Sequence, residues 1–470
     1  MKVKSFLGLL LVFLSISLVG QEKWTVEKCI EYAIKHNIQI RQQSLNAQMT
    51  RNNFRQSKMA VLPSLNFNAN HSWNFGHTVD PYTNDFIANN SQNDNFSLSS
   101  SITLFNGFQL LNSIRRSFYD WQAALSDRQK MINDISLNIA TAYLQMLYDK
   151  ENWQVADDQW QVNKEQLARS RLLYKAGSIA QGDVLTSEAQ LANAEMQVVS
   201  AKNQLAMSRL NLIQMMNLDS ANDFDIEYPN LAEISKSSLL VSVDTVYQTA
   251  VQNLPEIKSK ELKLKSSEIG FNIARGAQLP RIFLSGNYGT GYSDSRQKGT
   301  YVPVTQMIGY TASKEPVYAT SMKYQPEDYP FNDQLNDNAN KSLSLGMSIP
   351  LFNGYQARTQ ITNAKLSILN ARLAIQDTRQ QVYKQIEQAY ADAVASYNKY
   401  LAAKKSLTAQ KKAFEYMQKK FNVGMATTVD FNNAKSSLFK ARSDMIRNKY
   451  EFVFKLKVLD FYQGRPITFN

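Results

Sequence analysis

The spacing of apolar and polar positions changes along the first part of the chain. Residues 24–61 contain no glycine or proline and are rich in Gln, Lys, Ala and Met, which favours one helix that ends before Pro63. The period then becomes two, and apolar residues alternate mainly with Asn, Ser and Thr over 65–75 and again over 96–104. The sequence therefore predicts one helix followed by two strands.

Residues 108–174 show the longest uninterrupted helical pattern. They contain no glycine or proline, and apolar residues recur at every seventh position from Leu111 to Tyr174. At about 1.5 Å per residue such a helix extends roughly 100 Å, and the seven-residue spacing requires packing partners along the full length. Gly177 interrupts the pattern, and a further helix is predicted for 180–217.

The whole pattern occurs twice. The tetrapeptide LFNG at 104–107 returns 247 positions later at 351–354, whereas LPSL at 62–65 returns as LPRI at 279–282, only 217 positions later. A duplicated unit with an insertion of 30 residues in the second copy explains both spacings. The insertion falls within 293–341, which is rich in Pro, Tyr, Asp and Asn and is expected to be a loop outside the cell.

The first 20 residues have the pattern of a secretory signal peptide. Lys2 and Lys4 precede an apolar run from Phe6 to Ile16, which is too short to span a bilayer, and smaller residues follow near Gly20. No later segment has the roughly 18 uninterrupted apolar residues that a membrane-spanning helix needs. The chain is therefore expected to leave the cytoplasm.

The second copy repeats the two strand patterns, over 282–289 and 343–351. In each pattern one face is apolar and aromatic, while the other is Ser, Asn, Gly or Thr. A strand of a soluble sandwich shows the same alternation, but all four patterns in an exported chain favour a β-barrel with lipid outside and water inside. Four strands are too few to close a barrel, so several copies of the chain are required.

Charge and residue usage limit the other possibilities. The 470 residues include 52 Lys and Arg against 40 Asp and Glu, an excess that indicates solvated helix surfaces, and nucleic acid is not an expected partner for an exported chain. One cysteine, Cys29, and three histidines give no disulfide framework or zinc site, and no cofactor is expected. A hydrolase would need a nucleophile with a histidine partner, and no catalytic motif surrounds His36, His71 or His77.

These patterns together resemble the TolC-type outer-membrane efflux family. The resemblance covers nearly all of the mature chain and includes the duplicated helix–strand–strand–helix–helix order, the Leu-Pro before each first strand, and the motif G-x-x-x-x-x-D at 177–183 and 424–430. It implies a mixed α and β fold in which a trimer builds one twelve-stranded transmembrane β-barrel, with four strands per chain. A long α-helical coiled-coil barrel would continue it through the periplasm.

The resemblance also implies a function. The protein would be an exit duct in the outer membrane of a Gram-negative bacterium, without enzymatic activity, surrounded by outer-membrane lipid. It would passively conduct substrates of a tripartite efflux or type I secretion system, with a periplasmic membrane-fusion adaptor as direct partner and an inner-membrane pump as indirect partner. The alternative is a trimeric, barrel-anchored coiled-coil surface protein such as an adhesin, which does not explain the duplication.

The two glycine turns receive roles from the same resemblance. Tyr174, Gly177, Phe421 and Gly424 would form the periplasmic tip that contacts the adaptor. The alternative is that both glycines only end their helices.

A pore gate would lie just beyond these turns. Asp430 occupies the position of an aspartate ring, Asp183 that of a helix-bracing residue, and Asn433 stands where a second acidic ring would be. Ala426 replaces an arginine and Phe421 replaces a tyrosine of the family's gate, so the closed state is expected to be held differently. A carboxylate in the first turn of a helix is also favoured by the helix dipole, and this alternative stays open for both aspartates.

The predicted organisation of the chain follows from the repeat. It consists of a signal peptide at 1–20, repeat one at 21–217, a linker or equatorial segment at 218–243, repeat two at 244–460 and a C-terminal tail at 461–470.

Overall fold

The computed structural model describes the residues 23–79, 84, 86–87, 90–219, 224–229 and 241–468. The signal peptide predicted for 1–20 lies outside them, as does much of the predicted linker 218–243. The chain divides into two compact units, and each takes residues from both predicted repeats. The first unit is formed by Met1–Arg51, Tyr119–Leu264 and Leu369–Asn470, and the second by Asn52–Phe118 and Lys265–Ile368.

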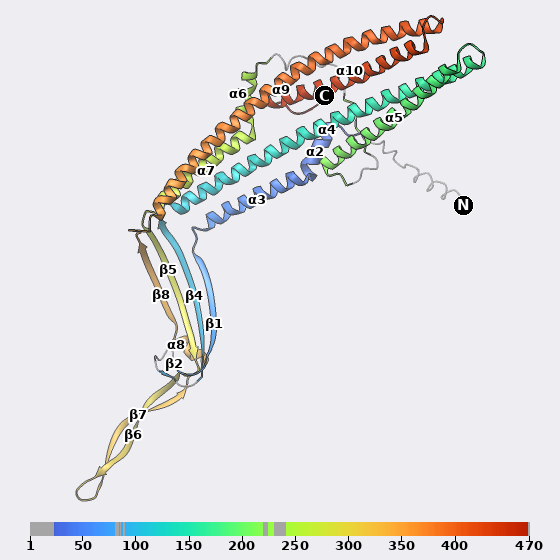
Figure 1. Ribbon diagram of the computed structural model, residues 1–470. Coiled ribbons are helices and arrows are strands. Elements are labelled where there is room, and N and C mark those ends of the chain that lie inside the picture. The colour runs from blue at the N-terminus through green and yellow to red at the C-terminus, as the bar shows by residue number, and fades with distance from the viewer. Residues whose placement is uncertain are drawn as a thin grey trace, which may run out of the picture. The chain divides into compact units, whose positions relative to one another are not determined.

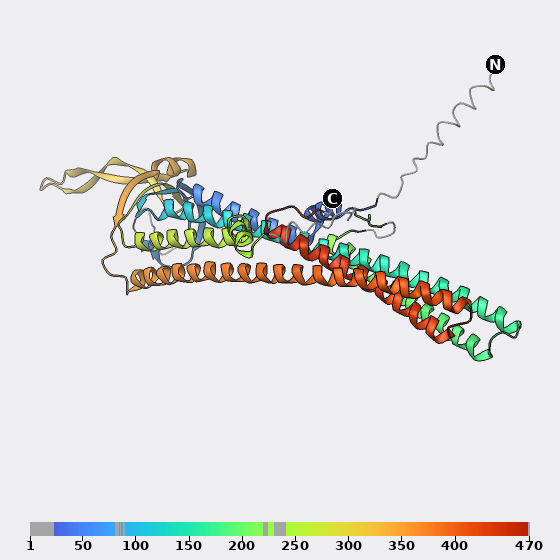
Figure 2. The same ribbon diagram turned by 90° about the horizontal axis from the view of Figure 1, so that it is seen from above.

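The first unit is helical, and Figure 2 shows α4 with α5 and α9 with α10 as two helical hairpins. Helices α2, α5, α6 and α10 lie wholly in this unit, while α3, α4, α7 and α9 contribute residues to both units. The helices are α2 (Val26–His36), α3 (Ile38–Met59), α4 (Gln109–Lys175), α5 (Gln181–Met216), α6 (Val243–Asn253), α7 (Pro255–Gly276), α9 (Gln356–Asn422) and α10 (Thr428–Tyr462).

The long helices α4 and α9 each contain 67 residues, and their first residues are 247 positions apart. The helices predicted for 108–174 and 180–217 are confirmed to within two residues. Apolar residues of the seven-residue row are buried in the middle of α4 but exposed near its ends, as at Leu111 and Tyr174. Among the helices that the structure describes, none combines the length and the apolar character needed to cross a membrane.

The prediction of a single helix over 24–61 is wrong, because the chain breaks at Asn37 into α2 and α3. The Asn37 backbone is extended, with ψ 127°. Its side-chain Oδ1 accepts hydrogen bonds from the N–H groups of Gln39 (2.9 Å) and Ile40 (3.2 Å), while Nδ2 donates to the carbonyl of Met215 (2.8 Å). Asparagine caps the start of α3 in this way, so the break needs neither glycine nor proline.

The larger of two hydrophobic clusters in the first unit surrounds the middle of α4. Tyr143 is fully buried there, and its hydroxyl donates to the carbonyls of Trp24 (3.0 Å) and Glu227 (2.6 Å). These bonds fix the start of the described chain and the segment 224–229 against α4. Burial raises the pKa of the Tyr143 hydroxyl well above its ordinary value, so this donor stays protonated.

The second unit contains an antiparallel sheet with the strand order β1-β4-β5-β8 (Figure 1). The strands are β1 (Ser64–Asn74), β4 (Ser91–Asn106), β5 (Arg281–Ser293) and β8 (Asn340–Ser348), which confirms the four predicted strands. A short ribbon of β2 (Thr78–Val79) and β3 (Phe86–Ile87) lies in the connection from β1 to β4. Strands β1 and β8 are the edges, and large apolar side chains such as Leu65, Phe67, Leu343 and Leu345 remain exposed on them.

The long loop expected at 293–341 is instead an ordered β-hairpin and a short helix. These elements are β6 (Gln297–Tyr310), β7 (Pro316–Asp328) and α8 (Phe331–Asp337). Prolines within the two strands suggested a loop. A two-stranded ribbon tolerates them because one side of each strand needs no hydrogen-bond donor.

Candidate functional site at the two hairpin turns

Each helical hairpin of the first unit reverses direction at the same kind of turn. Gly177 follows α4 with φ +70°, and Gly424 follows α9 with φ +77°. The glycine N–H donates to the carbonyl three positions back, that of Tyr174 at 2.9 Å and that of Phe421 at 3.1 Å. The next residue donates to the carbonyl five positions back, at 2.9 Å in both turns. This is the Schellman motif, whose positive φ favours glycine.

Apolar side chains surround both turns and are exposed in the single chain. A Cβ atom added at Gly177 or Gly424 would meet no atom within 4 Å. We call these exposed side chains the apolar turn surfaces. They comprise Leu172, Tyr174 and Leu185 at the first turn and Val423, Met425 and Val429 at the second.

Asp430 belongs to the N-terminal cap of α10. Its N–H donates to Thr427 Oγ1 (3.1 Å), and its Oδ2 accepts from the Thr427 hydroxyl (2.7 Å) and N–H (3.3 Å). These hydrogen bonds lower the pKa of the Asp430 carboxyl, so the exposed side chain is ionised near neutral pH. The capping box explains why an aspartate stands here whether or not it also lines a pore.

Repeat one lacks this capping box. Ala180 stands where repeat two has Thr427, and it makes no side-chain cap for α5. Asp183 lies in the first turn of α5 and is half-buried. The two aspartates therefore have different surroundings although they occupy equivalent positions. Asn433 lies one turn after Asp430 on α10, with an exposed side chain.

The second turn is bonded to α4 through Arg169 and Asn422, which the sequence did not single out. Phe421 stacks on Phe431, with ring centroids 4.6 Å apart, and the Arg169 guanidinium lies 5.9 Å from the Phe421 ring. Arg169 also donates to Asn422 Oδ1 (2.9 Å). Phe421 is thus a partly buried packing residue of the turn. Stacking on the Phe431 ring holds Phe421 in position, whereas a tyrosine would form a hydrogen bond through its hydroxyl.

The model of the outer membrane efflux protein family matches residues 29–218 and 246–464. The chain belongs to this family. Membership confirms the TolC-type resemblance and places the protein in the outer membrane, from which it extends into the periplasm. Comparison with curated proteins gives no match.

Solved structures with the same fold are distant in sequence from this efflux protein. VceC, an outer membrane protein of Vibrio cholerae, is 15% identical with a TM-score of 0.72, over 94% of this chain and 96% of VceC. The open-state MtrE channel of Neisseria gonorrhoeae is 19% identical with a TM-score of 0.72, over 94% and 88%. The CmeC channel of Campylobacter jejuni is 16% identical with a TM-score of 0.71, over 93% and 85%.

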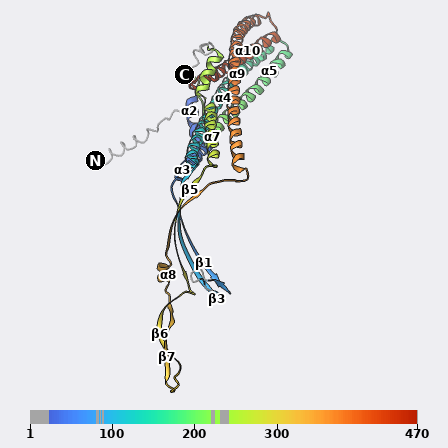
Figure 3. The same cartoon turned by 90° about the vertical axis from the view of Figure 1, so that its left-hand side faces the viewer.

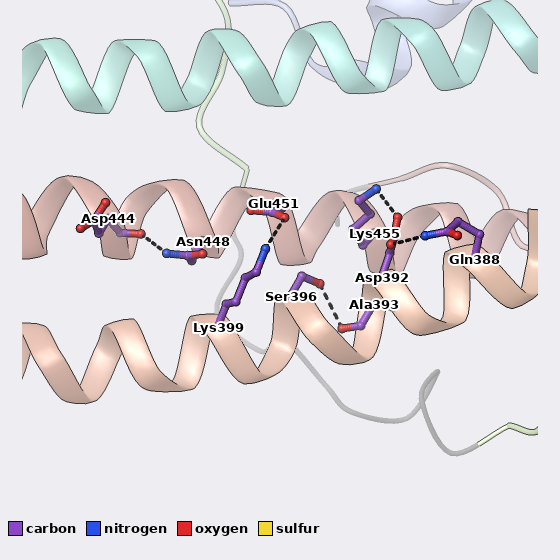
Figure 4. A network of polar contacts seen from close by, with 9 residues as sticks. All are labelled: Gln388, Asp392, Ala393, Ser396, Lys399, Asp444, Asn448, Glu451 and Lys455. Carbon is purple, nitrogen blue, oxygen red and sulfur yellow. Dashed lines mark hydrogen bonds and ion pairs between the residues drawn. The ribbon is translucent and has the colours of Figure 1, made fainter.

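Polar contacts hold α9 to α10 within the second hairpin of the efflux protein (Figure 4). Lys455 Nζ lies 2.6 Å from Asp392 Oδ2, and Lys399 Nζ lies 3.5 Å from Glu451 Oε1. The hydrogen bond from Lys455, helped by one from Gln388, lowers the pKa of the Asp392 carboxyl. The hairpin is therefore fixed well away from its turn.

A second set of contacts joins α10 to α4, between the two hairpins of the efflux protein. Arg442 bonds to Asp158 (2.7 Å) and the Tyr450 hydroxyl to Glu151 (2.5 Å). Lys435 Nζ donates to Asn163 Oδ1 (2.5 Å). Reading the sequence missed these pairs because their members are more than 270 positions apart in the chain.

Lys435 is the unusual member of this set. Only 3% of its surface is exposed, and its ammonium contacts the neutral amide of Asn163 and lies 5.5 Å from the centre of the Phe431 ring. Burial lowers the pKa of the Lys435 ammonium from 10.5 to about 8. The burial of Lys435 could not be predicted from the sequence, because it depends on which residues of other helices face it.

The side chains described above either form exposed surfaces at the turns or hold the helices together. Within the described part of the chain, no three His, Cys, Asp or Glu side chains come together as metal ligands do. The apolar turn surfaces and the ionised Asp430 are the features of the turns that can act on a partner or on a passing ion.

Proposed function

We propose that the protein is the exit duct of a tripartite efflux or type I secretion system. Three copies would form one channel that passively conducts substrates, delivered by an inner-membrane pump and a periplasmic adaptor, to the exterior. The observation that carries this proposal is the open sheet β1-β4-β5-β8, whose edge strands β1 and β8 expose both backbone and apolar side chains. Such edges are stable in a bilayer only when other strands pair with them.

The apolar turn surfaces would form the adaptor-contact tip. Tyr174 contributes directly, because its side chain is exposed. Gly177 and Gly424 allow the backbone to turn, and Phe421 supports the second turn by stacking on Phe431. Exposed apolar patches of this kind are typical of protein–protein contacts. An adaptor with a complementary apolar helical end is the partner that they fit.

We predict that Gly424→Val weakens adaptor crosslinking while trimers persist. The added side chain meets no atom of its own chain within 4 Å, but a β-branched residue at φ +77° strains the turn by about 1–2 kcal/mol and is expected to displace its apolar surface. Site-specific crosslinking to the adaptor measures the effect. Gly182→Ala is the matched control, because Gly182 also has open space but lacks the positive φ. Loss of trimers with Gly424→Val would assign the glycine a purely structural role.

The proposed gate consists of one Asp430 from each copy, with Asp183 bracing helices and Asn433 adding no charge. An ionised carboxylate ring at a constriction attracts cations. Hydrogen bonds from Thr427 favour the ionised form of each Asp430 carboxyl, while the three neighbouring negative charges oppose full ionisation until a cation binds. The negative charge of this ring would make the channel prefer cations over anions.

Single-channel recording tests this proposal. The reconstituted trimer is expected to be cation-selective and to be blocked modestly by cobalt hexammine from the periplasmic side. Asp430→Asn should abolish the block, because it removes the charge but keeps an oxygen for the α10 cap. Thr427→Ala should preserve the block, because it breaks the cap but keeps the charge, and Asp183→Asn should also preserve it. A block that survives Asp430→Asn unchanged would show that the gate lies elsewhere.

A further inference from the structure

The β6–β7 hairpin is anchored to the sheet by a buried side chain. Gln334 of α8 is only 1% exposed, and its Oε1 accepts from the N–H of Ser293 at 3.0 Å. Its Nε2 donates to the carbonyls of Ser293 (3.0 Å) and Tyr329 (2.9 Å). The end of β5 and the segment that follows β7 are therefore fixed to one another by three hydrogen bonds.

Further contacts hold α8 on the end of β5. Asn338 Nδ2 donates to the carbonyl of Gly291 (2.7 Å), and Thr290 Oγ1 donates to the carbonyl of Leu335 (2.5 Å). The Phe331 ring packs against Tyr292, with centroids 5.1 Å apart. The hairpin projects from this stem beyond the end of the sheet (Figure 3). These contacts therefore fix the direction in which the β6–β7 hairpin leaves the sheet.

One face of the hairpin is apolar and exposed. Cross-strand pairs on this face place Tyr301 opposite Tyr324, Pro303 opposite Met322, and Met307 opposite Tyr318, with the polar pair Thr305–Thr320 between the last two. Each of these tyrosines and methionines is between 42% and 65% exposed. The opposite face carries the charged residues Lys298, Lys323 and Glu327 together with the partly buried Val302 and Val304. A two-stranded ribbon is marginal in water, and an uncovered apolar face on it indicates a partner.

The place of the hairpin in the sheet identifies the partner as a second copy of this chain. The hairpin leaves the interior strand β5 and returns to the edge strand β8, where the proposed duct requires the next copy to join. Its strands and turn carry three lysines and three carboxylates, so copies meet without net repulsion: Lys298, Lys314, Lys323, Glu315, Glu327 and Asp328. In the shorter β1–β4 connection of repeat one, the described residues form no ribbon longer than the two-residue strands β2 and β3.

We infer that the three β6–β7 hairpins of the duct pack their Tyr–Met faces against one another over its outer mouth and narrow it. This inference rests on the trimer of the proposed function. It adds a constriction separate from the proposed gate at Asp430, built from the insertion that the second repeat carries.

Cysteine crosslinking on the purified, full-length protein tests the inference. Met322→Cys lies on the apolar face, and its neighbour Lys323→Cys lies on the charged face; both positions are exposed. The native Cys29 is buried and does not compete. Mild oxidation of trimers is expected to give several times more disulfide-linked dimer with Met322→Cys than with Lys323→Cys.

A conductance measurement completes the test. Replacing residues 299–326 by a short Gly-Ser link is expected to leave trimers intact and to raise single-channel conductance, because it removes one of two constrictions in series. Equal crosslinking by both cysteines, or unchanged conductance, would overturn the inference while the trimer stands. Monomers in the unmodified protein would instead overturn the proposed function.

Discussion

Replacing Gly107 with alanine is expected to destabilise the fold severely, whereas the same change at Gly354 has a small effect. Both glycines end an identical LFNG tetrapeptide, and both have positive φ, +65° and +61°. The shared backbone strain of an alanine there is about 1 kcal/mol. Their surroundings differ: a Cβ at Gly107 would lie 2.2 Å from the carbonyl oxygen of Gly276, while a Cβ at Gly354 meets nothing within 4 Å.

The clash at Gly107 cannot be relieved by rotating a side chain. The opposing atom belongs to the backbone at the end of α7, and Leu279 Cβ lies 2.9 Å away on another side. Overpacking typically costs about 1–3 kcal/mol, and the upper end is expected where the opposing atom is backbone that cannot move aside. Gly276→Ala should be equally harmful, because its Cβ would lie 2.4 Å from the Gly107 carbonyl oxygen.

Thermal unfolding of the purified protein measures the difference. Gly107→Ala and Gly276→Ala are expected to lower the unfolding temperature or to prevent accumulation, with Gly354→Ala as the matched control. Similar shifts for Gly107→Ala and Gly354→Ala would show that the close approach of α4 to α7 is not present in solution.

Asn163→Leu is the second change with a large expected effect, because it strands a buried charge. Lys435 donates to Asn163 Oδ1 in an environment that is nearly closed to water. Removing that acceptor is expected to destabilise the helical unit by about 2–3 kcal/mol at pH 7. Adding Lys435→Met should rescue most of this loss, since an apolar pair of similar volume carries no charge to desolvate.

The effect of Lys435 depends on pH. Its pKa in the folded protein, about 8, is below its ordinary value of 10.5, so the unfolded chain binds more protons between these pH values. Stability contributed by this site therefore rises as pH increases from 8 to 10.5, and below pH 8 the full cost of the buried charge is present.

Denaturant unfolding at pH 7 and pH 9.5 checks both expectations. The loss caused by Asn163→Leu should be smaller at the higher pH, and Lys435→Met alone should flatten the dependence on pH in this range. A pH-independent loss, or no rescue in the double variant, would contradict the assignment of Lys435 as a buried cation.

Much of the fold was determined by the sequence alone because it depends on local or periodic signals. The absence of glycine and proline indicated the length of α4. The second LFNG tetrapeptide, at 351–354, indicated where the equivalent helix α9 begins. Alternation of period two located the four strands of the sheet. The turns at Gly177 and Gly424 were also predictable, because a glycine that ends a long helical pattern takes a positive φ.

Only the tertiary structure decided the features that join distant parts of the chain. Asn37 breaks a helix because its amide reaches Met215, and Lys435 is buried because Asn163 faces it. The two LFNG glycines differ only in whether Gly276 lies against them. A sequence fixes backbone preference and periodicity within a segment, but the cost of a side chain depends on which atoms other segments bring to it.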